Sequence, residues 1–87
     1  MNLKKLVGMA NSIGAFFAAE SNRADALEGI ASHIRRFWDP RMRAQLIAGF
    51  DRGECTDASP LVIEAIAANR ERLLGGTVRP GEPPRTG

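Results

Sequence analysis

The sequence predicts an all-α fold, a small bundle of about four short helices followed by a disordered, Gly/Pro-rich C-terminal tail. Apolar residues recur at spacings of three and four residues in four separate segments, which is the period of one helix face, and no segment has the alternating pattern of a strand. Asp-Pro, Ser-Pro and Gly-Gly pairs separate the later segments. We therefore expect one helical domain over residues 1–74 and a disordered tail over residues 75–87.

The first helix is expected over residues 3–19. Its glycines, Gly8 and Gly14, each cost about 1 kcal/mol relative to alanine in a helix interior, so we expect another helix or a partner to pack closely there. Its apolar stripe comprises Leu3, Leu6, Val7, Ala10, Ile13 and Phe17, with Met9 and Phe16 on the flank.

The start of the chain loosely imitates a signal peptide, because Lys4 and Lys5 precede an apolar stretch. Asn11 and Ser12 interrupt that stretch, and it falls short of the ~20 apolar residues that cross a membrane. We expect neither cleavage nor membrane insertion.

The second helix is expected to begin at a cap formed by Ser21 or Asn22, with Asp25 near its positive N-terminal end. Arg35 and Arg36 fall in its last turn, where cations favour the negative end of the helix dipole. Its predicted buried face comprises Leu27, Ile30, Ala31, Ile34, Phe37 and Trp38.

Each of the two later helices begins at a proline that follows a capping residue, which is acidic in one helix and carries a hydroxyl in the other. Asp39-Pro40 predicts an N-capped helix over residues 40–50, with Met42, Leu46, Ile47 and Phe50 on its apolar side. Ser59-Pro60 predicts a fourth helix over residues 60–74 that Gly75-Gly76 ends. Its stripe comprises Leu61 or Val62, then Ala65, Ile66, Asn69 and Leu73.

The composition predicts no catalytic, cofactor or metal site in this chain. Its single histidine, His33, and single cysteine, Cys55, cannot supply a histidine- or cysteine-rich metal site. Glu54 and Asp57 flank Cys55, and acidic neighbours raise a thiol pKa, which disfavours a nucleophile. The glycines form neither a Walker loop nor a dinucleotide-binding fingerprint.

The strongest functional signal is the stretch "RRFWDPRMR" at 35–43, which contains the only tryptophan and four arginines. Tryptophan and arginine dominate protein–protein hot spots, and arginine pairs with carboxylates or phosphates through its planar fork. We predict that the capped corner at Asp39-Pro40 binds a partner protein. The candidate partner-binding residues are His33, Arg35, Arg36, Phe37, Trp38, Asp39, Pro40, Arg41, Met42 and Arg43.

Two alternatives remain open at this point. Phe37 and Trp38 can belong to the core instead of an interface; the helix periodicity favours burial of Phe37 more than that of Trp38. A small nucleic-acid-binding regulator is the second alternative, because the corner superficially resembles a helix-turn-helix. The mild net charge of +2 and the scarcity of base-reading side chains beyond Gln45 disfavour it.

Three segments carry a family resemblance: "LVGMANSIGAFF" at 6–17, "IASHIRRFWDPRMRAQLIAGF" at 30–50 and "SPLVIEAI" at 59–66. They resemble the delta subunit of NAD-dependent, molybdenum-containing formate dehydrogenases. The resemblance implies a non-catalytic accessory subunit of a cytoplasmic hetero-oligomer, bound to the catalytic molybdenum-containing subunit. It also implies that other subunits hold the molybdenum cofactor, iron–sulfur clusters and flavin, and that the complex uses NAD.

Overall fold

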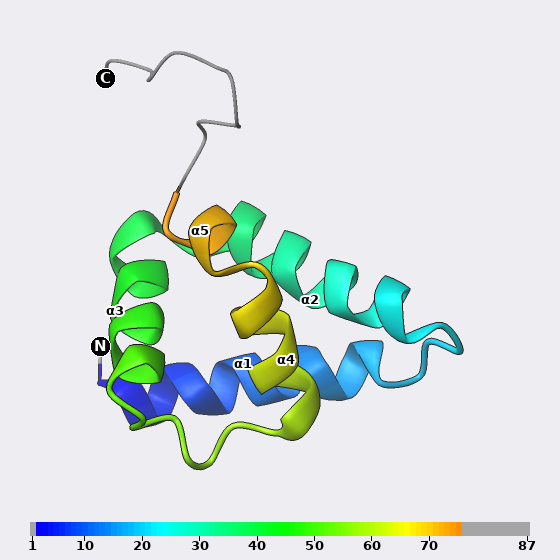
Figure 1. Cartoon of the computed structure of the whole chain (residues 1–87), viewed down its shortest axis with the longest axis horizontal. Helices are drawn as coiled ribbons and strands as arrows, with labels where there is room; N and C mark the ends of the chain where they lie inside the picture. The colour runs from blue at the N-terminus through cyan, green and yellow to red at the C-terminus, as the bar shows by residue number, and fades with distance from the viewer. Residues whose placement is uncertain (1, 76–87) are drawn as a thin grey trace.

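The computed structural model describes residues 2–75, and these are helical with short connections (Figure 1). The helices are α1 (Leu3–Phe17), α2 (Arg23–Phe37), α3 (Pro40–Asp51), α4 (Pro60–Ala68) and α5 (Arg70–Leu73). The predicted all-α class is confirmed. Apart from Gly75, the predicted tail at 75–87 lies outside the described residues.

The helix starts follow the capping chemistry in the sequence. The Asn22 side chain accepts a hydrogen bond from the backbone N–H of Asp25 at 3.2 Å, so Asn22 rather than Ser21 caps α2. Asp39 accepts from the N–H of Met42 at 2.9 Å, and Ser59 accepts from the N–H of Val62 at 3.3 Å. Each of these two caps is followed by a proline in the first helical turn, as predicted.

The end of α3 is fixed by Gly53, which adopts a φ of +72°. The N–H of Gly53 donates to the carbonyl of Phe50 at 3.0 Å, and the N–H of Glu54 donates to the carbonyl of Gly49 at 2.9 Å. This is the paired hydrogen-bond pattern of a Schellman cap, and it requires the left-handed conformation that glycine adopts without strain.

The predicted fourth helix is wrong in one respect, because it divides at Asn69 into α4 and α5. The Asn69 side-chain amide donates to the carbonyl of Ala65 at 3.0 Å, while its backbone leaves helical geometry at φ −126° and ψ 24°. Asparagine competes for helix carbonyls in this way, and the periodicity of the apolar stripe does not reveal such competition.

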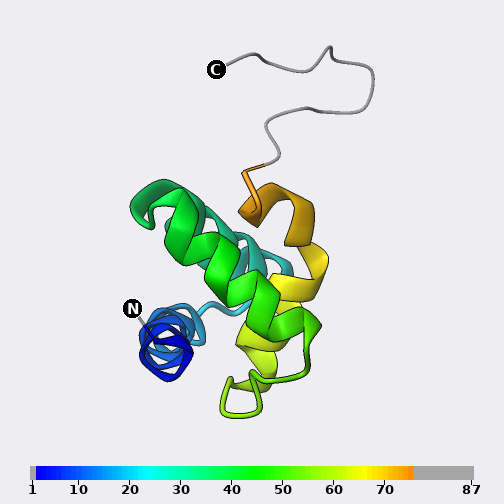
Figure 2. The same cartoon turned by 90° about the vertical axis from the view of Figure 1, so that its left-hand side faces the viewer.

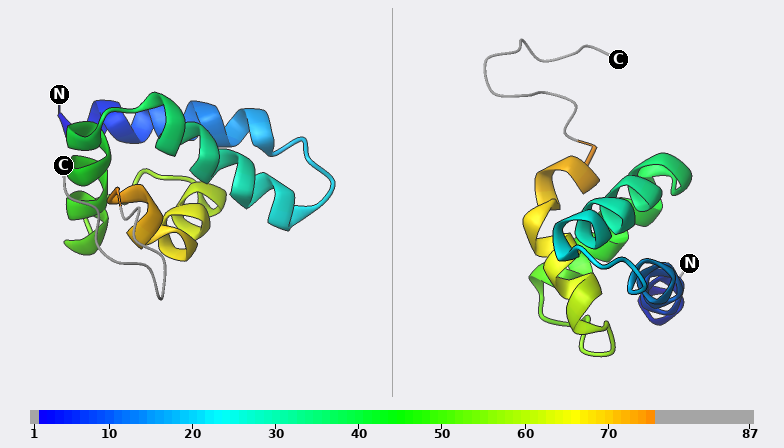
Figure 3. Two further views of the ribbon diagram at one scale, coloured as in Figure 1. Left: turned by 90° about the horizontal axis from the view of Figure 1, so that it is seen from above. Right: turned by 90° about the vertical axis from the view of Figure 1, so that its right-hand side faces the viewer.

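The helices enclose a single apolar core. α1 and α2 form a hairpin, α3 stands across its open end, and α4 packs against both hairpin helices (Figures 1 and 2). The view from above shows α4 and α5 together on one side of α2 (Figure 3). The largest fully buried side chains are Leu6, Ile30, Ile34, Leu46, Ile47, Val62, Ile66 and Leu73.

Close approach of α4 to α1 occurs at Gly14. A Cβ atom added to Gly14 would lie 2.7 Å from Cγ2 of Val62, which is fully buried and β-branched. The predicted close packing therefore holds at Gly14. At Gly8 no other helix of this chain packs closely, because no atom lies within 4 Å of the position that a Cβ would occupy; close packing of a partner there stays a prediction.

The short helix α5 is held by arginine contacts to two other helices. Arg72 donates to both carboxylate oxygens of Glu28 on α2, at 2.8 and 2.9 Å, and Arg70 binds both oxygens of Asp51 on α3. Ser32 donates to Glu28 at 2.8 Å, and these contacts lower the pKa of Glu28 to about 2. The carboxylate is therefore charged in the folded protein at neutral pH.

Candidate partner interface

The structure separates the ten predicted partner-binding residues by exposure. Trp38 and Arg43 are buried, with 6% and 5% of their surface exposed. His33, Arg35 and Met42 are half-buried, and the remaining five are exposed: Arg36, Phe37, Asp39, Pro40 and Arg41.

Phe37 and Trp38 have the reverse of the burial that periodicity favours, since Phe37 is 69% exposed. The buried face of α2 centres on Ile34, and Trp38 follows it by four residues with an extended backbone at φ −90° and ψ 142°. Phe37 instead follows His33 by four residues, and the two rings are in contact, with centroids 4.7 Å apart and planes inclined by 39°. Trp38 is therefore a core residue of this chain, and the ring of Phe37 is exposed at the surface.

Arg43 has a structural role and does not lie on an exposed binding surface. Its Nη1 donates to the carbonyl of Leu73 at 3.1 Å, tying α3 to the end of α5, and its buried Nε has no hydrogen-bond partner. Burial lowers the pKa of Arg43, the neighbouring Arg35 lowers it further, and Asp39 opposes the shift.

A surface groove runs between α1 and α2. It has a volume of about 530 Å³, and its lining residues are Ser12, Ile13, Phe16, Phe17, His33 and Phe37. We refer to it as the Phe16–Phe37 groove, because these two rings are 75% and 69% exposed. The Arg36 guanidinium carbon lies 5.8 Å from the centroid of Phe37, at the edge of the groove.

The sequence pattern located only part of this groove. The sequence pattern places Phe16 on the flank of the first stripe, whereas its proximity to His33 and Phe37 follows from the packing of α1 on α2. The four-residue spacing of His33 and Phe37 was the signal available in the sequence, because residues at that spacing lie on one side of a helix.

The cations other than buried Arg43 divide into two groups in the described part of the chain. Arg23, Arg52, Arg70 and Arg72 each form an ion pair with a carboxylate. Five others form no such pair within residues 2–75, and they lie at the start of α1, the end of α2 and the start of α3, at the left of Figure 1. We call these residues the basic side: Lys4, Lys5, Arg35, Arg36 and Arg41.

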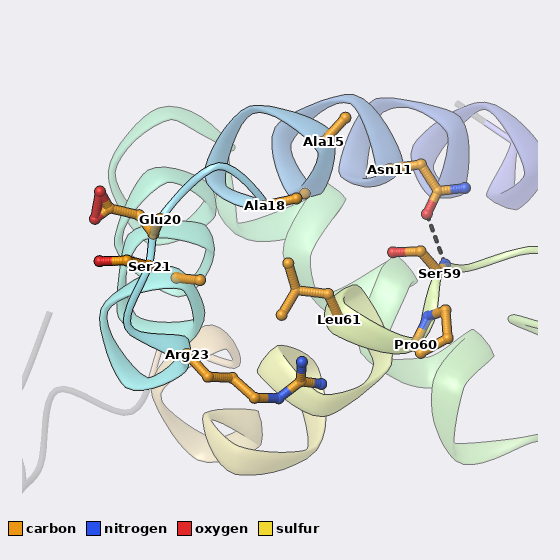
Figure 4. Close-up of a pocket in the computed structure, with 11 residues that line it drawn as sticks. Asn11, Ala15, Ala18, Glu20, Ser21, Arg23, Ser59, Pro60 and Leu61 are labelled. Carbon is orange, nitrogen blue, oxygen red and sulfur yellow. Dashed lines mark hydrogen bonds between the residues drawn. The ribbon is translucent and has the colours of Figure 1, made fainter.

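A second hollow, of about 580 Å³, lies where the end of α1, the start of α2 and the start of α4 meet (Figure 4). Asn11 extends from α1 toward the loop before α4, where its oxygen accepts from the N–H of Ser59 at 2.8 Å and its amide donates to the carbonyl of Asp57 at 2.9 Å. Arg23 is held by Glu64. The polar side chains of this hollow thus mainly join structural elements.

Cys55 lies in the core, where its thiol contacts the carbonyl of Leu46 at 3.8 Å. Burial is the main cause of its raised pKa, Glu54 adds to the shift, and Arg52 opposes it. The predicted direction is therefore confirmed, with burial as a cause that the sequence reasoning did not include. Residues 2–75 contain no group of three or more metal-ligating side chains that could hold an ion.

None of the helices found in residues 2–75 has the length and apolar character needed to cross a membrane. A model of the family described as NADH-dependent formate dehydrogenase delta subunit, FdsD, matches residues 5–66, which include every residue that lines the Phe16–Phe37 groove. No curated protein and no solved structure matches the chain. With a family match that covers most of its length, the chain belongs to the delta subunit family of NADH-dependent formate dehydrogenases.

Proposed function

We propose that the chain is a non-catalytic accessory subunit that binds and stabilises, or helps to assemble, a cytoplasmic, molybdenum-containing, NAD-dependent formate dehydrogenase. The observation that supports this function is the family match over residues 5–66, which extends from α1 into α4. Its partner is the catalytic subunit, and the two chains associate in a hetero-oligomer.

Under this proposal the redox chemistry belongs to other subunits, which carry the molybdenum cofactor, the iron–sulfur clusters and the flavin and use NAD. This chain contributes a binding surface. Arg35, Arg36 and Arg41 are available to carboxylates or backbone carbonyls of the partner, because no ion pair occupies them within residues 2–75. Trp38 and Arg43 act indirectly: Trp38 anchors the corner between α2 and α3 in the core, and Arg43 ties α3 to the end of α5.

Binding to a folded partner stabilises that partner by mass action. Loss of the subunit is therefore expected to lower the yield of the complex, its cofactor content, or both. If the chain acts in assembly, its loss reduces the molybdenum content of newly made enzyme. If it acts in the finished complex, its loss shortens the lifetime of enzyme that is already loaded.

The test is copurification from the native host. Tagged full-length chain is expected to recover the large molybdenum-containing subunit, identified by mass spectrometry, in a fixed stoichiometry after nuclease treatment. A strain that lacks the chain is expected to yield less formate dehydrogenase activity and less bound molybdenum per cell. Recovery of nucleic acid without any formate dehydrogenase subunit would contradict the proposal and support a nucleic-acid-binding regulator.

A further inference from the structure

We propose that the Phe16–Phe37 groove is the docking site for an apolar segment of the formate dehydrogenase complex that carries carboxylates along its edge. This inference rests on the proposed function and adds the surface and the chemistry of its partner. It moves the hydrophobic anchors from Trp38, which is buried, to two rings on the surface of α1 and α2.

The groove gathers exposed aromatic side chains. The chain has only five aromatic residues, four Phe and one Trp, yet two of them leave most of their rings in water. Both lie on one groove of about 530 Å³, and Ile13 and Phe17 continue its apolar lining. Exposed aromatic rings gathered at one hollow are the usual composition of an interface centre.

The charge around the groove indicates which kind of partner it binds. None of the six residues that line the groove is acidic, and α1 contains no acidic residue. The two acidic residues of α2 lie elsewhere: Asp25 is in its first turn, far from Phe37, and Glu28 is held by Arg72. The lining of the groove therefore contains no carboxylate, and Glu20, which follows α1, lines the other hollow.

A cation borders the groove. Arg36 lies over the Phe37 ring, and its exposed guanidinium has no ion pair within the described residues. Lys5 lies on the same side of α1 as Phe16 but about three helical turns away, so it extends the positive charge beyond the groove. A partner that presents apolar side chains beside carboxylates can contact the exposed rings and pair with Arg36.

A second copy of this chain, bound groove to groove, does not provide these carboxylates. Groove-to-groove contact between two copies would bring together two linings without carboxylates, each bordered by Arg36, and like charges across an interface oppose association. The charges thus favour a different protein with acidic residues at its binding segment.

The binding experiment uses the full-length chain and formate dehydrogenase complex purified from a strain that lacks it. The double variant Phe16→Ser/Phe37→Ser is expected to bind at least about tenfold more weakly than wild type, as for the loss of hot-spot residues. The matched control is Leu74→Ser, because Leu74 is also an exposed large apolar residue, at 46%, but lies after α5. Its affinity should remain within about twofold of wild type, since it lies outside the interface centre.

The charge is tested at Arg36. Arg36→Glu should weaken binding about tenfold or more, while Arg36→Lys, which keeps the cation, should stay within about threefold. Equal losses of affinity for both variants would overturn the carboxylate part of the proposal, because they would mean that binding depends on the shape of the side chain at this position and not on its charge.

Folding of each variant is checked by far-ultraviolet circular dichroism and by the fluorescence of buried Trp38. Hydrogen exchange of the wild-type chain provides a measurement that needs no substitution: complex formation should slow exchange at residues 12–17 and 33–37. Protection confined to other segments would overturn the docking site.

The outcomes separate this inference from the proposed function. If wild type binds the complex and the double phenylalanine variant binds equally well, the groove is not the interface, while the accessory function stands. If wild type fails to bind the complex at all, the proposed function fails and the docking site fails with it. If wild type instead forms a dimer that the double variant abolishes, a second copy occupies the groove and the proposal is wrong.

Discussion

At the scale of single residues, Phe37 and Trp38 are adjacent in sequence and opposite in environment. Trp38 is 6% exposed and belongs to the core cluster, whereas Phe37 is 69% exposed. The cause is the helix terminus between them: Phe37 is the last residue of α2, and the extended backbone of Trp38 turns its ring inward. One peptide bond thus separates a residue needed for folding from a residue available for binding.

Truncation of each ring should reveal this difference. Trp38→Ala is expected to lower the free energy of unfolding by about 3–5 kcal/mol, because it removes a large buried side chain and leaves a cavity. Phe37→Ala should change it by less than about 1 kcal/mol, since an exposed ring loses little on truncation. Urea denaturation followed by circular dichroism measures both; similar losses for the two variants would contradict the structure.

The capping and turn residues were predictable at this scale, but the burial or exposure of neighbouring apolar residues was not. Asp39-Pro40 and Ser59-Pro60 specify helix starts through local hydrogen bonds, and both were located from sequence. The burial of Trp38 depends on the backbone beyond the helix, where a rotation of 100° per residue no longer applies.

At the scale of elements, the helix pairs are joined by two kinds of contact. α1 and α4 approach closely at Gly14, where a side chain would meet Val62. α5 is instead held by Arg72–Glu28 and Arg70–Asp51 ion pairs to α2 and α3. Ion-pair partners more than forty positions apart, such as Glu28 and Arg72, cannot be recognised from helix periodicity, because the pairing depends on how the helices pack.

Two glycine substitutions on one helix test the α1–α4 contact. Gly14→Ala should destabilise the protein by about 1–3 kcal/mol, because the added methyl group overpacks against buried Val62. Gly8→Ala meets no atom within 4 Å and should stabilise the protein by up to about 1 kcal/mol through better helix propensity. Thermal denaturation of the pair provides the measurement, and the opposite order of stabilities would rule out this packing.

The ion pair between α2 and α5 predicts a dependence of stability on pH. The pKa of Glu28 falls from an ordinary 4.5 to about 2, so its contribution is fully present above about pH 4.5 and is lost as the pH falls toward 2. Because Glu28 is 59% exposed, water screens the pair and its contribution stays below about 1 kcal/mol. Glu28→Gln should therefore lose a small part of the acid dependence seen in wild type.

That comparison is made by urea denaturation at a series of pH values between about 2 and 6, the range in which carboxylates titrate. Glu64→Gln is the matched control: the pKa of Glu64 is lowered by Arg23, but its ion pair joins α4 to α2 and leaves α5 untouched. An identical acid dependence in wild type and Glu28→Gln would mean that Arg72 does not hold Glu28 in solution.

At the scale of the whole molecule, cations are distributed unevenly. Ion pairs within the chain occupy the arginines that join α2, α3, α4 and α5, while the basic side has none in the described residues. A domain of this size buries only about 60% of the surface of its unfolded chain, so a partner that covers the remaining apolar groove adds to its stability.

The affinity of the chain for its complex should consequently fall with salt. Raising NaCl from about 50 mM to about 500 mM is expected to weaken binding at least about threefold, because salt screens the contacts of the basic side. Arg36→Glu should show a shallower dependence than wild type. Calorimetric titration at several salt concentrations measures the slope, and an affinity that rises with salt in wild type would argue for a purely apolar interface.

The helix end between Phe37 and Trp38 also has an evolutionary consequence. Under the docking proposal, selection acts on Trp38 through the interior of its own chain and on Phe37 through the surface of the partner. Among related chains, position 38 should therefore vary together with core positions such as Ile34 and Leu46, whereas position 37 should vary together with residues of the catalytic subunit. The substitution patterns at two adjacent positions would then reflect two different molecular contacts.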